Sequence, residues 1–456
     1  MRSLYTQFCA GLLFPLHERL KGHDSVAVRR ELEASQWYSS ELLRGLQIRR
    51  LKDLLHHADS NVPYYRQIFA ELGFAPDSVR SLDDLGRLPF LTKTAIRANT
   101  DALKSGMATN LTRLNTGGSS GEPLIFFVGK ERTSHDVAAK WRATRWWDVD
   151  IGDREIVVWG SPIELSTQDR IKSVRDQLMR TRLLPAFEMS AAKLDGFIAT
   201  MRSVRPRMLF GYPSALSHIA RHAEATGKRL NDVGIQVAFV TSEQLYDDQR
   251  AQIEKTFGCR VANGYGGRDA GFIAHQCPEG EMHITAEDII VEIIDTEGKV
   301  LPPGSSGEIV VTHLASRDFP FIRYRTGDIG VVSTRQCRCG RGLPVLQEVQ
   351  GRTTDFVVAQ DGTIMHGLAL IYVMRDLPGV QAFKIVQESL DHTRIILTPN
   401  DGVDVVALSG KIVEGLRARL GYGTKITVDI VDQIPAEKSG KYRYIQSNVV
   451  AANIIG

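Results

Sequence analysis

Residues 114–127 read LNTGGSSGEPLIFF and place three glycines and two serines in one short loop before an apolar run. Consecutive glycines let successive backbone N–H groups point the same way, and serine hydroxyls add donors, which is how a peptide surrounds a phosphate. The loop does not match the Walker pattern, because Gly121 is followed by Glu122 and not by lysine. Taken alone, the pattern favours an ordinary turn over a phosphate loop.

Three further short motifs follow along the chain, and each is weak by itself. They are NGYGGRDAG at 263–271, FIRYRTGDIG at 321–330 and IPAEKSGKYRYI at 434–445. The order and spacing of the four motifs resemble the adenylate-forming superfamily of acyl-CoA synthetases, adenylation domains and luciferases. The segments LLHHADSNVPYYRQIF, GYPSAL and TSEQL resemble its phenylacetate–CoA ligase branch, which includes the CapK-like proteins of polysaccharide gene clusters. The resemblance covers nearly the whole chain.

The resemblance implies an enzyme that joins a carboxylate to ATP, with Mg²⁺, and forms an acyl-adenylate and pyrophosphate. Because the departing pyrophosphate is strongly anionic, the glycine loop then becomes a phosphate cradle. The residues that correspond to this cradle are Thr116, Gly117, Gly118, Ser119, Ser120 and Gly121.

The motif NGYGGRDAG corresponds to the adenine and magnesium part of such a site. The resemblance implies that the ring of Tyr265, between Gly264 and Gly266, stacks on adenine and that Asp269 coordinates magnesium. Most superfamily members have Thr-Glu where this chain has Arg268 followed by Asp269. The shorter aspartate still offers oxygen ligands to a hard cation. The alternative is a β-turn with a buried tyrosine.

The remaining site residues come from four separate segments. Asp328, in YRTGD, corresponds to the carboxylate that accepts hydrogen bonds from both ribose hydroxyls, although an isolated TGD is typical of a turn. Ser242 and Glu243, in TSE, are expected at the adenine pocket, and Arg352 at the nucleotide beside the domain junction. Lys441, in SGKYR, corresponds to the mobile lysine of a C-terminal lid, whose cation stabilises the adenylation transition state. The alternative is a solvated surface lysine.

Composition excludes several other classes of protein. The 456 residues are 43% hydrophobic and 24% charged, as in ordinary globular proteins. The net charge of +3 is too balanced for a nucleic-acid partner, and no apolar run approaches the ~20 residues of a membrane span. The N-terminal stretch LYTQFCAGLLFPLH is expected to form an amphipathic helix that packs on the protein or grazes a membrane. Five sparse cysteines favour the reducing cytoplasm.

Hydrophobic periodicity predicts an α/β fold in two parts. Residues 28–75 have helical spacing, and from about 155 short β-rich runs alternate with helical stretches. The strands near 289–314 are linked by a Gly/Pro-rich turn and predict a hairpin. We expect a large N-terminal α/β domain with layered sheets at 1–350, which binds nucleotide and acid. A small mobile α+β lid carrying the lysine follows at 351–456.

A second group of residues has the types that bind a metal. Cys277 and His283 are separated by five residues, and Cys337 and Cys339 form a C-x-C pair. Three thiols and an imidazole suit a tetrahedral structural zinc, and the resemblance adds that some relatives carry such a cluster. The alternative is two exposed cysteines and an unrelated Cys–His pair. His275 is a second candidate for the histidine ligand.

The leading functional hypothesis is an AMP-forming ligase that activates a small carboxylic acid and transfers it to coenzyme A. Thr354 stands where an acidic hinge residue is common, and 359–367 lacks the Arg-Gly segment typical of coenzyme A docking, so adenylation is the better supported half-reaction. The alternative acceptor is an amine or hydroxyl of a sugar in surface-polysaccharide biosynthesis. A non-catalytic, zinc-stabilised binding protein is the alternative of another class. A monomer or homodimer is expected.

Overall fold

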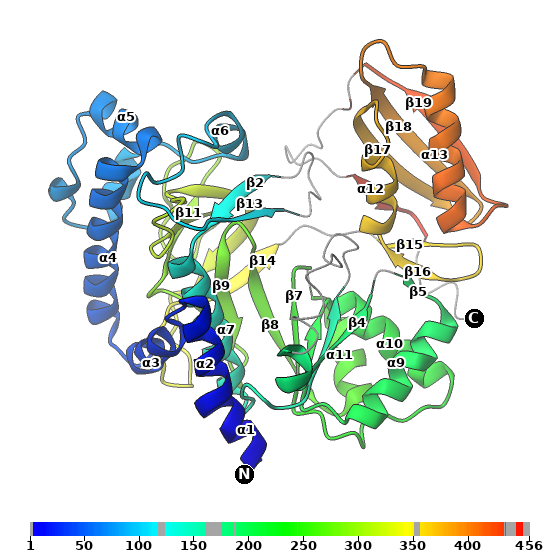
Figure 1. The fold of residues 1–456 in the computed structure, drawn as a ribbon, viewed down its shortest axis with the longest axis horizontal. Coiled ribbons are helices and arrows are strands. Elements are labelled where there is room, and N and C mark those ends of the chain that lie inside the picture. The colour runs from blue at the N-terminus through cyan, green and yellow to red at the C-terminus, as the bar shows by residue number, and fades with distance from the viewer. Residues whose placement is uncertain are drawn as a thin grey trace.

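The computed structural model describes residues 3–116, 124–159, 175–186, 188–243, 245–350, 356–432, 434 and 444–449. The first hundred residues are helical, as predicted for 28–75, and lie along one side of the molecule (Figure 1). The helix α4 begins after Ser39, whose side chain caps Leu42 N, and ends before Pro63, which cannot continue the hydrogen-bond ladder. The helices of this part are α1 (Leu4–Phe8), the π-helical η1 (Cys9–Leu13), α2 (Phe14–Lys21), α3 (Ser25–Ser35), α4 (Ser40–Asn61), α5 (Pro63–Leu72), the short η2 (Pro76–Ser78) and η3 (Leu82–Arg87), and α6 (Lys93–Ala98).

An 11-stranded mixed sheet forms the centre of the fold. Its order is β11-β12-β13-β14-β10-β9-β8-β7-β6-β3-β4, and the run from β8 to β4 is parallel whereas the run from β8 to β11 is antiparallel. Its strands are β3 (Glu155–Trp159), β4 (Thr181–Pro185), β6 (Met208–Gly211), β7 (Val237–Thr241), β8 (Arg260–Gly267), β9 (Gly271–Gln276), β10 (Met282–Ile284), β11 (Ile289–Ile294), β12 (Ser306–His313), β13 (Tyr324–Val332) and β14 (Val345–Gln350). The predicted α/β class and the hairpin near 289–314 are confirmed.

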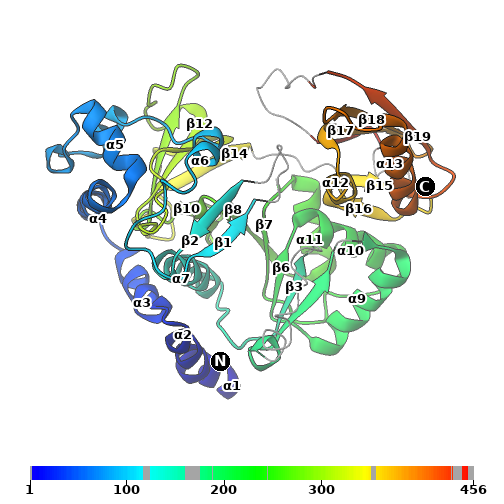
Figure 2. The same ribbon diagram turned by 45° about the horizontal axis from the view of Figure 1, so that its top comes forward.

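Helices cover both faces of the parallel part of the sheet (Figure 2). Helix α7 (Lys130–Trp146) packs on one face through Ala143, next to Phe239 of β7. Helices α9 (Ala191–Val204), α10 (Pro213–Ala225) and α11 (Asp247–Phe257) pack on the other face, where Val240 is buried among their apolar side chains. Burial on both faces explains why β6 and β7 read as continuous apolar runs.

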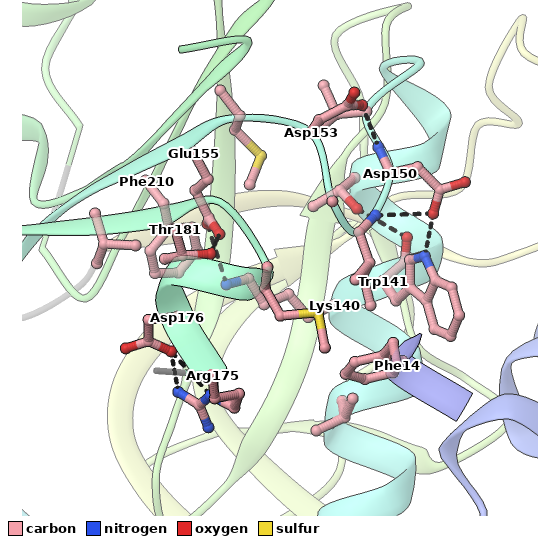
Figure 3. Close-up of a pocket in the computed structure, with 18 of the residues that line it drawn as sticks. Phe14, Lys140, Trp141, Asp150, Asp153, Glu155, Arg175, Asp176, Thr181 and Phe210 are labelled. Carbon is pink, nitrogen blue, oxygen red and sulfur yellow. Dashed lines mark hydrogen bonds and ion pairs between the residues drawn. The ribbon is translucent and has the colours of Figure 1, made fainter. Parts of the chain in front are cut away.

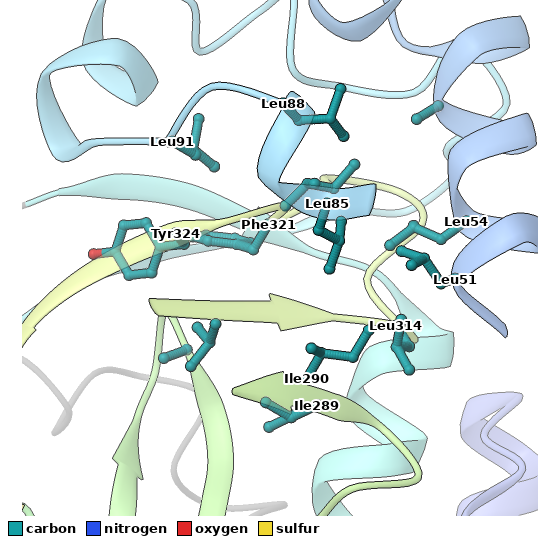
Figure 4. Packing of buried hydrophobic residues seen from close by; sticks show 14 of the residues in the cluster. Leu51, Leu54, Leu85, Leu88, Leu91, Ile289, Ile290, Leu314, Phe321 and Tyr324 are labelled. Atoms are coloured by element: carbon teal, nitrogen blue, oxygen red, sulfur yellow. The ribbon is translucent and has the colours of Figure 1, made fainter. Parts of the chain in front are cut away.

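The largest hydrophobic core joins the N-terminal helices to the antiparallel part of the sheet (Figure 4). Leu51 and Leu54 of α4 face Ile290 of β11 and Phe321, which precedes β13. A two-stranded ribbon, β1 (Thr112–Asn115) with β2 (Ile125–Val128), joins the same core through the fully buried Phe126. This core fixes the antiparallel strands that carry Tyr324, whose ring lies at the edge of the cluster.

The C-terminal residues build a separate four-stranded sheet with its own core. Its order is β19-β18-β17-β20, with α12 and α13 packed against it (Figure 1). The elements are β15 (Phe356–Val358), β16 (Ile364–His366), α12 (Leu368–Arg375), β17 (Val380–Ser389), β18 (His392–Pro399), α13 (Val405–Leu420), β19 (Lys425–Ile430) and β20 (Ile445–Ser447). A further small sheet pairs β15 and β16 with β5 (Glu188–Met189), so this part also contacts the N-terminal part. The expected boundary at 351–355 lies outside the described residues, and the division at 350 stays a prediction.

None of the helices in the described part of the chain has the length and apolar character needed to cross a membrane.

Candidate nucleotide site and metal centre

The predicted nucleotide residues gather where the sheet changes from parallel to antiparallel pairing. Strand β8 pairs in parallel with β7, where Thr241 lies opposite Gly264, and in antiparallel fashion with β9. Ligands of open α/β sheets bind at the carboxyl ends of parallel strands. The motif NGYGG therefore occupies the edge where such a ligand is expected.

Two glycines of this motif are required by the backbone. A Cβ on Gly266 would lie 2.3 Å from the carbonyl oxygen of Gly271, and the strand register shifts between Tyr265 and Gly267. A Cβ on Gly267 would lie 2.6 Å from Oδ1 of Asp269. These residues form a bulged hairpin that only glycine fits, and bulges of this kind redirect neighbouring side chains. By contrast, Gly264 has ordinary space around it.

Tyr265 and Asp328 meet although they lie on distant strands. Four strand steps separate β8 from β13, which in a flat sheet would be roughly 19 Å. The Tyr265 hydroxyl nevertheless donates to Oδ2 of Asp328 at 3.0 Å, so the antiparallel half of the sheet curls towards β8. Thr326 holds the Asp328 backbone, accepting from its N–H at 3.1 Å and donating to the Ile309 carbonyl. Burial, reinforced by the Asp328 charge, raises the pKa of Tyr265 well above its usual value, so the hydroxyl remains a donor.

Asp269 is held in one orientation by residues that the sequence motifs do not reveal. The buried Tyr324 hydroxyl donates to its Oδ2 at 2.6 Å, and Ala270 N donates to its Oδ1 at 3.1 Å. The buried Arg132 of α7 donates to the carbonyls of Arg268 and Asp269, at 2.9 and 2.8 Å. The turn therefore presents a fixed carboxylate, which suits a hard cation such as Mg²⁺.

The TSE segment lies beside this turn. Ser242 follows β7 with a φ of 73°, a left-handed conformation that is rare for a residue with a side chain. Glu243 is close enough to Tyr212, at the carboxyl end of β6, for its charge to add to burial in raising the pKa of that phenol. Both residues lie at the expected edge of the sheet.

The other predicted nucleotide residues are described only in part. The Thr116 side chain accepts from Leu124 N at 3.1 Å, and its N–H donates to the Leu124 carbonyl, so it closes the base of the glycine loop. The predicted residues Gly117, Gly118, Ser119, Ser120, Gly121, Arg352 and Lys441 lie outside the described residues.

A cavity of about 790 Å³ lies between α2, α7 and the β3–β4–β6 part of the sheet (Figure 3). Phe210 and Trp141 form part of its apolar wall, and Lys140 crosses it towards Glu155, with 3.6 Å between the charged atoms. At the carboxyl end of β3 the wall is Trp159, which stacks on Tyr212 with ring centroids 4.3 Å apart. The cavity thus runs towards the edge that carries the nucleotide residues.

The four predicted metal ligands come together at one point. The ligand atoms of Cys277, His283, Cys337 and Cys339 all lie within 4.8 Å of one another. The Cys277 and Cys337 sulfurs are 3.6 Å apart, far longer than a disulfide and near the roughly 3.8 Å edge of a tetrahedral zinc–thiolate site. Cys339 Sγ lies 3.2 Å from His283 Nε2. The second candidate, His275, is not part of this group and instead stacks on Phe272.

The surroundings of this cluster fit a cation. His283 Nδ1 lies 3.2 Å from the Leu343 carbonyl, which selects the tautomer with Nε2 available as a ligand. Burial lowers the pKa of His283 to about 4 and raises that of Cys337 to about 12, so the imidazole is neutral and the thiol needs a cation to ionise. Burial also raises the pKa of Cys277. Strand β10 pairs with both β9 and β14, which brings the two ligand-bearing loops together.

Comparisons with known proteins show what the chain resembles. The CapK C-terminal domain family matches residues 357–448. The chain is 23% identical to Protein CapK of Staphylococcus aureus over 89% of both chains. It is 24% identical to the phenylacetate–coenzyme A ligase of Thermus thermophilus, over 89% of this chain and 96% of that one. Over most of its length the chain is therefore similar to proteins of the phenylacetate–CoA ligase and CapK-like branch of adenylate-forming enzymes.

The solved structures show the adenylate-forming fold. A 2-hydroxyisobutyryl-CoA ligase in complex with 2-HIB-AMP and CoA, in the thioesterification state, is 20% identical and has a TM-score of 0.64 over 92% of each chain. The same ligase in the postadenylation state has a TM-score of 0.59 over 90% of each chain. The predicted architecture of a large α/β part followed by an α+β part is that of this superfamily.

Sequence reasoning missed the residues that orient the candidate site. Tyr324 lies within FIRYRTGDIG, but its residue type and spacing suggest no role, and Arg132 belongs to none of the motifs. Their partners lie 55 and more than 130 residues away in sequence, so only the fold brings them together. Of the tryptophans, Trp146 and Trp147 donate to groups of the protein interior, to Gln36 and to the Gln276 carbonyl, as core residues do.

Proposed function

We propose that the chain is an ATP-dependent, AMP-forming ligase that activates a small carboxylic acid as its acyl-adenylate and transfers the acyl group to coenzyme A. The observation that carries this proposal is that Tyr265, Asp328 and Asp269 meet at one edge of the sheet. Tyr265 donates to the Asp328 carboxylate, and Tyr324 donates to the Asp269 carboxylate. These three side chains supply an aromatic face, an acceptor for the ribose and an oxygen ligand for Mg²⁺. The branch assignment points to the same chemistry.

Each residue has a definite task in this proposal. The ring of Tyr265 holds adenine and Asp328 accepts from the ribose hydroxyls. Asp269, fixed by Tyr324, holds Mg²⁺, which neutralises phosphate charge when bound. The loop from Thr116 to Gly121 surrounds the phosphates, and the lid, proposed at 351–456, delivers Lys441 to the α-phosphate. The acid's side chain enters the cavity at Trp159, and its carboxylate faces the nucleotide.

Two acceptors compete for the second half-reaction. Coenzyme A is favoured by the phenylacetate–coenzyme A ligases, whose lengths this chain largely covers. An amine or hydroxyl of a sugar is favoured by the match of residues 357–448 to the CapK C-terminal domain family. The segment 359–367 lacks Arg-Gly, which also favours the second acceptor. We retain coenzyme A as the first choice.

ATP–pyrophosphate exchange across a panel of short aliphatic, hydroxylated and aromatic acids tests the first half-reaction. One or more acids should give exchange that requires Mg²⁺ and is lost in Asp269→Ala. Thiol consumption with coenzyme A, measured on the best acid, then separates the two acceptors. Absence of exchange with every acid would favour the alternative class, a zinc-stabilised binding protein.

We further propose that the four-residue cluster binds one structural zinc ion. Supporting this are the 3.6 Å sulfur separation and the carbonyl that selects the histidine tautomer. Protein purified without chelator should contain about one equivalent of zinc, and Cys337→Ser with Cys339→Ser should lose it and melt at lower temperature. The buried Cys259, outside the cluster, gives the control: Cys259→Ser should keep the metal. Metal-free wild-type protein of undiminished stability would contradict the proposal.

A further inference from the structure

The N-terminal helix exposes a continuous apolar stripe. Large apolar side chains recur at every fourth position, and all five are exposed: Leu4 by 85%, Phe8 by 48%, Leu12 by 59%, Leu16 by 52% and Leu20 by 80%. They are five of the 17 large apolar side chains that are exposed in the described part of the chain, and they fall within 17 residues. Single exposed leucines are normal, whereas a contiguous patch marks an interaction surface.

The π-helical turn in the middle keeps this stripe on one face. In an α-helix, positions four residues apart drift by about 40° per step, so a long stripe would wind around the helix. The turn η1, Cys9–Leu13, closes i→i+5 hydrogen bonds and therefore has more residues per turn, which reverses the drift between Phe8 and Leu12. The helix is thus shaped to present its apolar residues together.

The opposite face of the helix is fixed to the protein. Thr6 donates to Asp153 at 2.8 Å, and the Tyr5 hydroxyl donates to the Leu178 carbonyl at 2.9 Å. Cys9 is fully buried against Gly152: a Cβ added to Gly152 would lie 2.3 Å from the Cβ of Cys9. These contacts prevent the helix from rolling to bury the stripe.

Basic side chains lie at the C-terminal end of the stripe. Arg19 and Lys21 are exposed on α2 on either side of Leu20, and Lys130 reaches to within 2.8 Å of where a Cβ of Gly22 would be.

The acidic groups of this region are largely engaged. Glu18 is buried and accepts from Ser25, and Asp153 accepts from Thr6. Asp176 forms an ion pair with Arg175. Asp24, beyond the end of α2, is exposed.

We propose that this face of α1, η1 and α2 docks on an anionic lipid bilayer, with the five apolar side chains in the interfacial layer and the basic groups at the headgroups. A helix with apolar residues on one face and Lys and Arg beside them lies in such an interface. The stripe lies at the edge of the molecule away from β17–β19 and α13, so docking leaves that part uncovered (Figure 1).

Co-sedimentation with lipid vesicles tests this proposal on the full chain. At about 0.1 M salt, wild-type protein should bind phosphatidylcholine vesicles containing about 30 mol% phosphatidylglycerol at least ~10-fold more strongly than pure phosphatidylcholine vesicles. The variant Leu12→Gln with Leu16→Gln should lose ~10-fold or more of that binding. Arg19→Glu with Lys21→Glu should lose the preference for anionic lipid.

A matched pair of exposed leucines elsewhere provides the control. Leu42→Gln with Leu72→Gln, on α4 and α5, should leave vesicle binding unchanged. All variants should keep the wild-type melting temperature, because the substituted side chains are exposed. Wild-type protein that ignores both vesicle types would overturn the proposal. A wild-type dimer in light scattering that Leu12→Gln with Leu16→Gln converts to monomer, without vesicle binding, would instead assign the stripe to a second copy.

Discussion

Replacing Asp328 by alanine tests the nucleotide site most directly. In the structure, Oδ2 of Asp328 already accepts from Tyr265 at 3.0 Å, so the carboxylate has a fixed orientation before nucleotide arrives. If it accepts from the ribose hydroxyls, its removal costs about 1.5–3 kcal/mol of binding, the range for hydrogen bonds to a charged group. That loss corresponds to an increase of about 10- to 150-fold in the Kd for ATP.

Calorimetry with ATP and with 2′-deoxy-ATP measures both the loss and its cause. Wild-type protein should bind 2′-deoxy-ATP more weakly than ATP, whereas Asp328→Ala should bind the two nucleotides equally, because the acceptor for the 2′-hydroxyl is gone. Tyr265→Phe is the matched control, since it removes the protein's own hydrogen bond and keeps the ring, and it should change the Kd by less than about 3-fold.

Two results would refute the reasoning. An Asp328→Ala protein that still prefers ATP over 2′-deoxy-ATP as strongly as wild type would show that another group reads the ribose. A loss of affinity accompanied by a large fall in melting temperature would show that Asp328 acts through the fold. Removing one hydrogen bond of about 1 kcal/mol from a chain of this size should shift that temperature by no more than about 2–4 °C.

The remaining predictions concern orientation, the lid and pH. Tyr324→Phe removes the hydrogen bond that orients Asp269, so the rate of ATP–pyrophosphate exchange should fall about 10- to 100-fold and exchange should need more Mg²⁺. An unchanged Mg²⁺ requirement would contradict a role of Tyr324 in orienting Asp269. Lys441→Ala should lower the kcat of adenylation at least ~100-fold with little change in KM, while a supplied acyl-adenylate still reacts with the acceptor; equal loss in both half-reactions would indicate a disturbed lid. Burial lowers the pKa of His218 to about 4, so the folded state holds the ring neutral and stability is lost as pH falls from about 6.5 towards 4. In His218→Gln the melting temperature should fall less between about pH 6.5 and pH 4 than in the wild type. If the melting temperatures of the two proteins fall equally with pH, His218 does not cause the loss of stability.

The features that sequence predicted are the locally determined ones. Apolar runs identified β6, β7 and β8, and the glycines of NGYGG predicted a special turn because a tight backbone needs residues without a Cβ. Long-range features were not predictable. The curl that brings Tyr265 to Asp328, and the pairing of β16 with β5, depend on how distant segments pack. The cysteine and histidine spacing predicted the four residues that the fold brings together, but only the pairing of β10 with two neighbours explains why they meet.

The contact between the two parts of the chain connects the fold to the proposed lid. Tyr372, on α12 of the C-terminal part, is close enough to Arg268 and Tyr212 to affect the pKa of each. Arg268 adjoins Asp269 in sequence, and Tyr212 stacks on Trp159 at the mouth of the cavity. Helix α12 therefore lies close to both the turn that carries Asp269 and the mouth of the cavity.

The strand pairing between the two parts is short among the described residues. It joins Ile364 to Met189 and Met365 to Glu188, two residue pairs of a ladder. Small contacts between domains of one chain allow them to reorient, because few interactions have to break. A lid that alternates between two half-reactions needs a contact of this size. The contact must be strong enough to favour one arrangement of the lid, and weak enough to break within a catalytic cycle so that the other arrangement can form. In the proposed lid, Tyr372 and the β16–β5 pairing would stabilise one of the two arrangements.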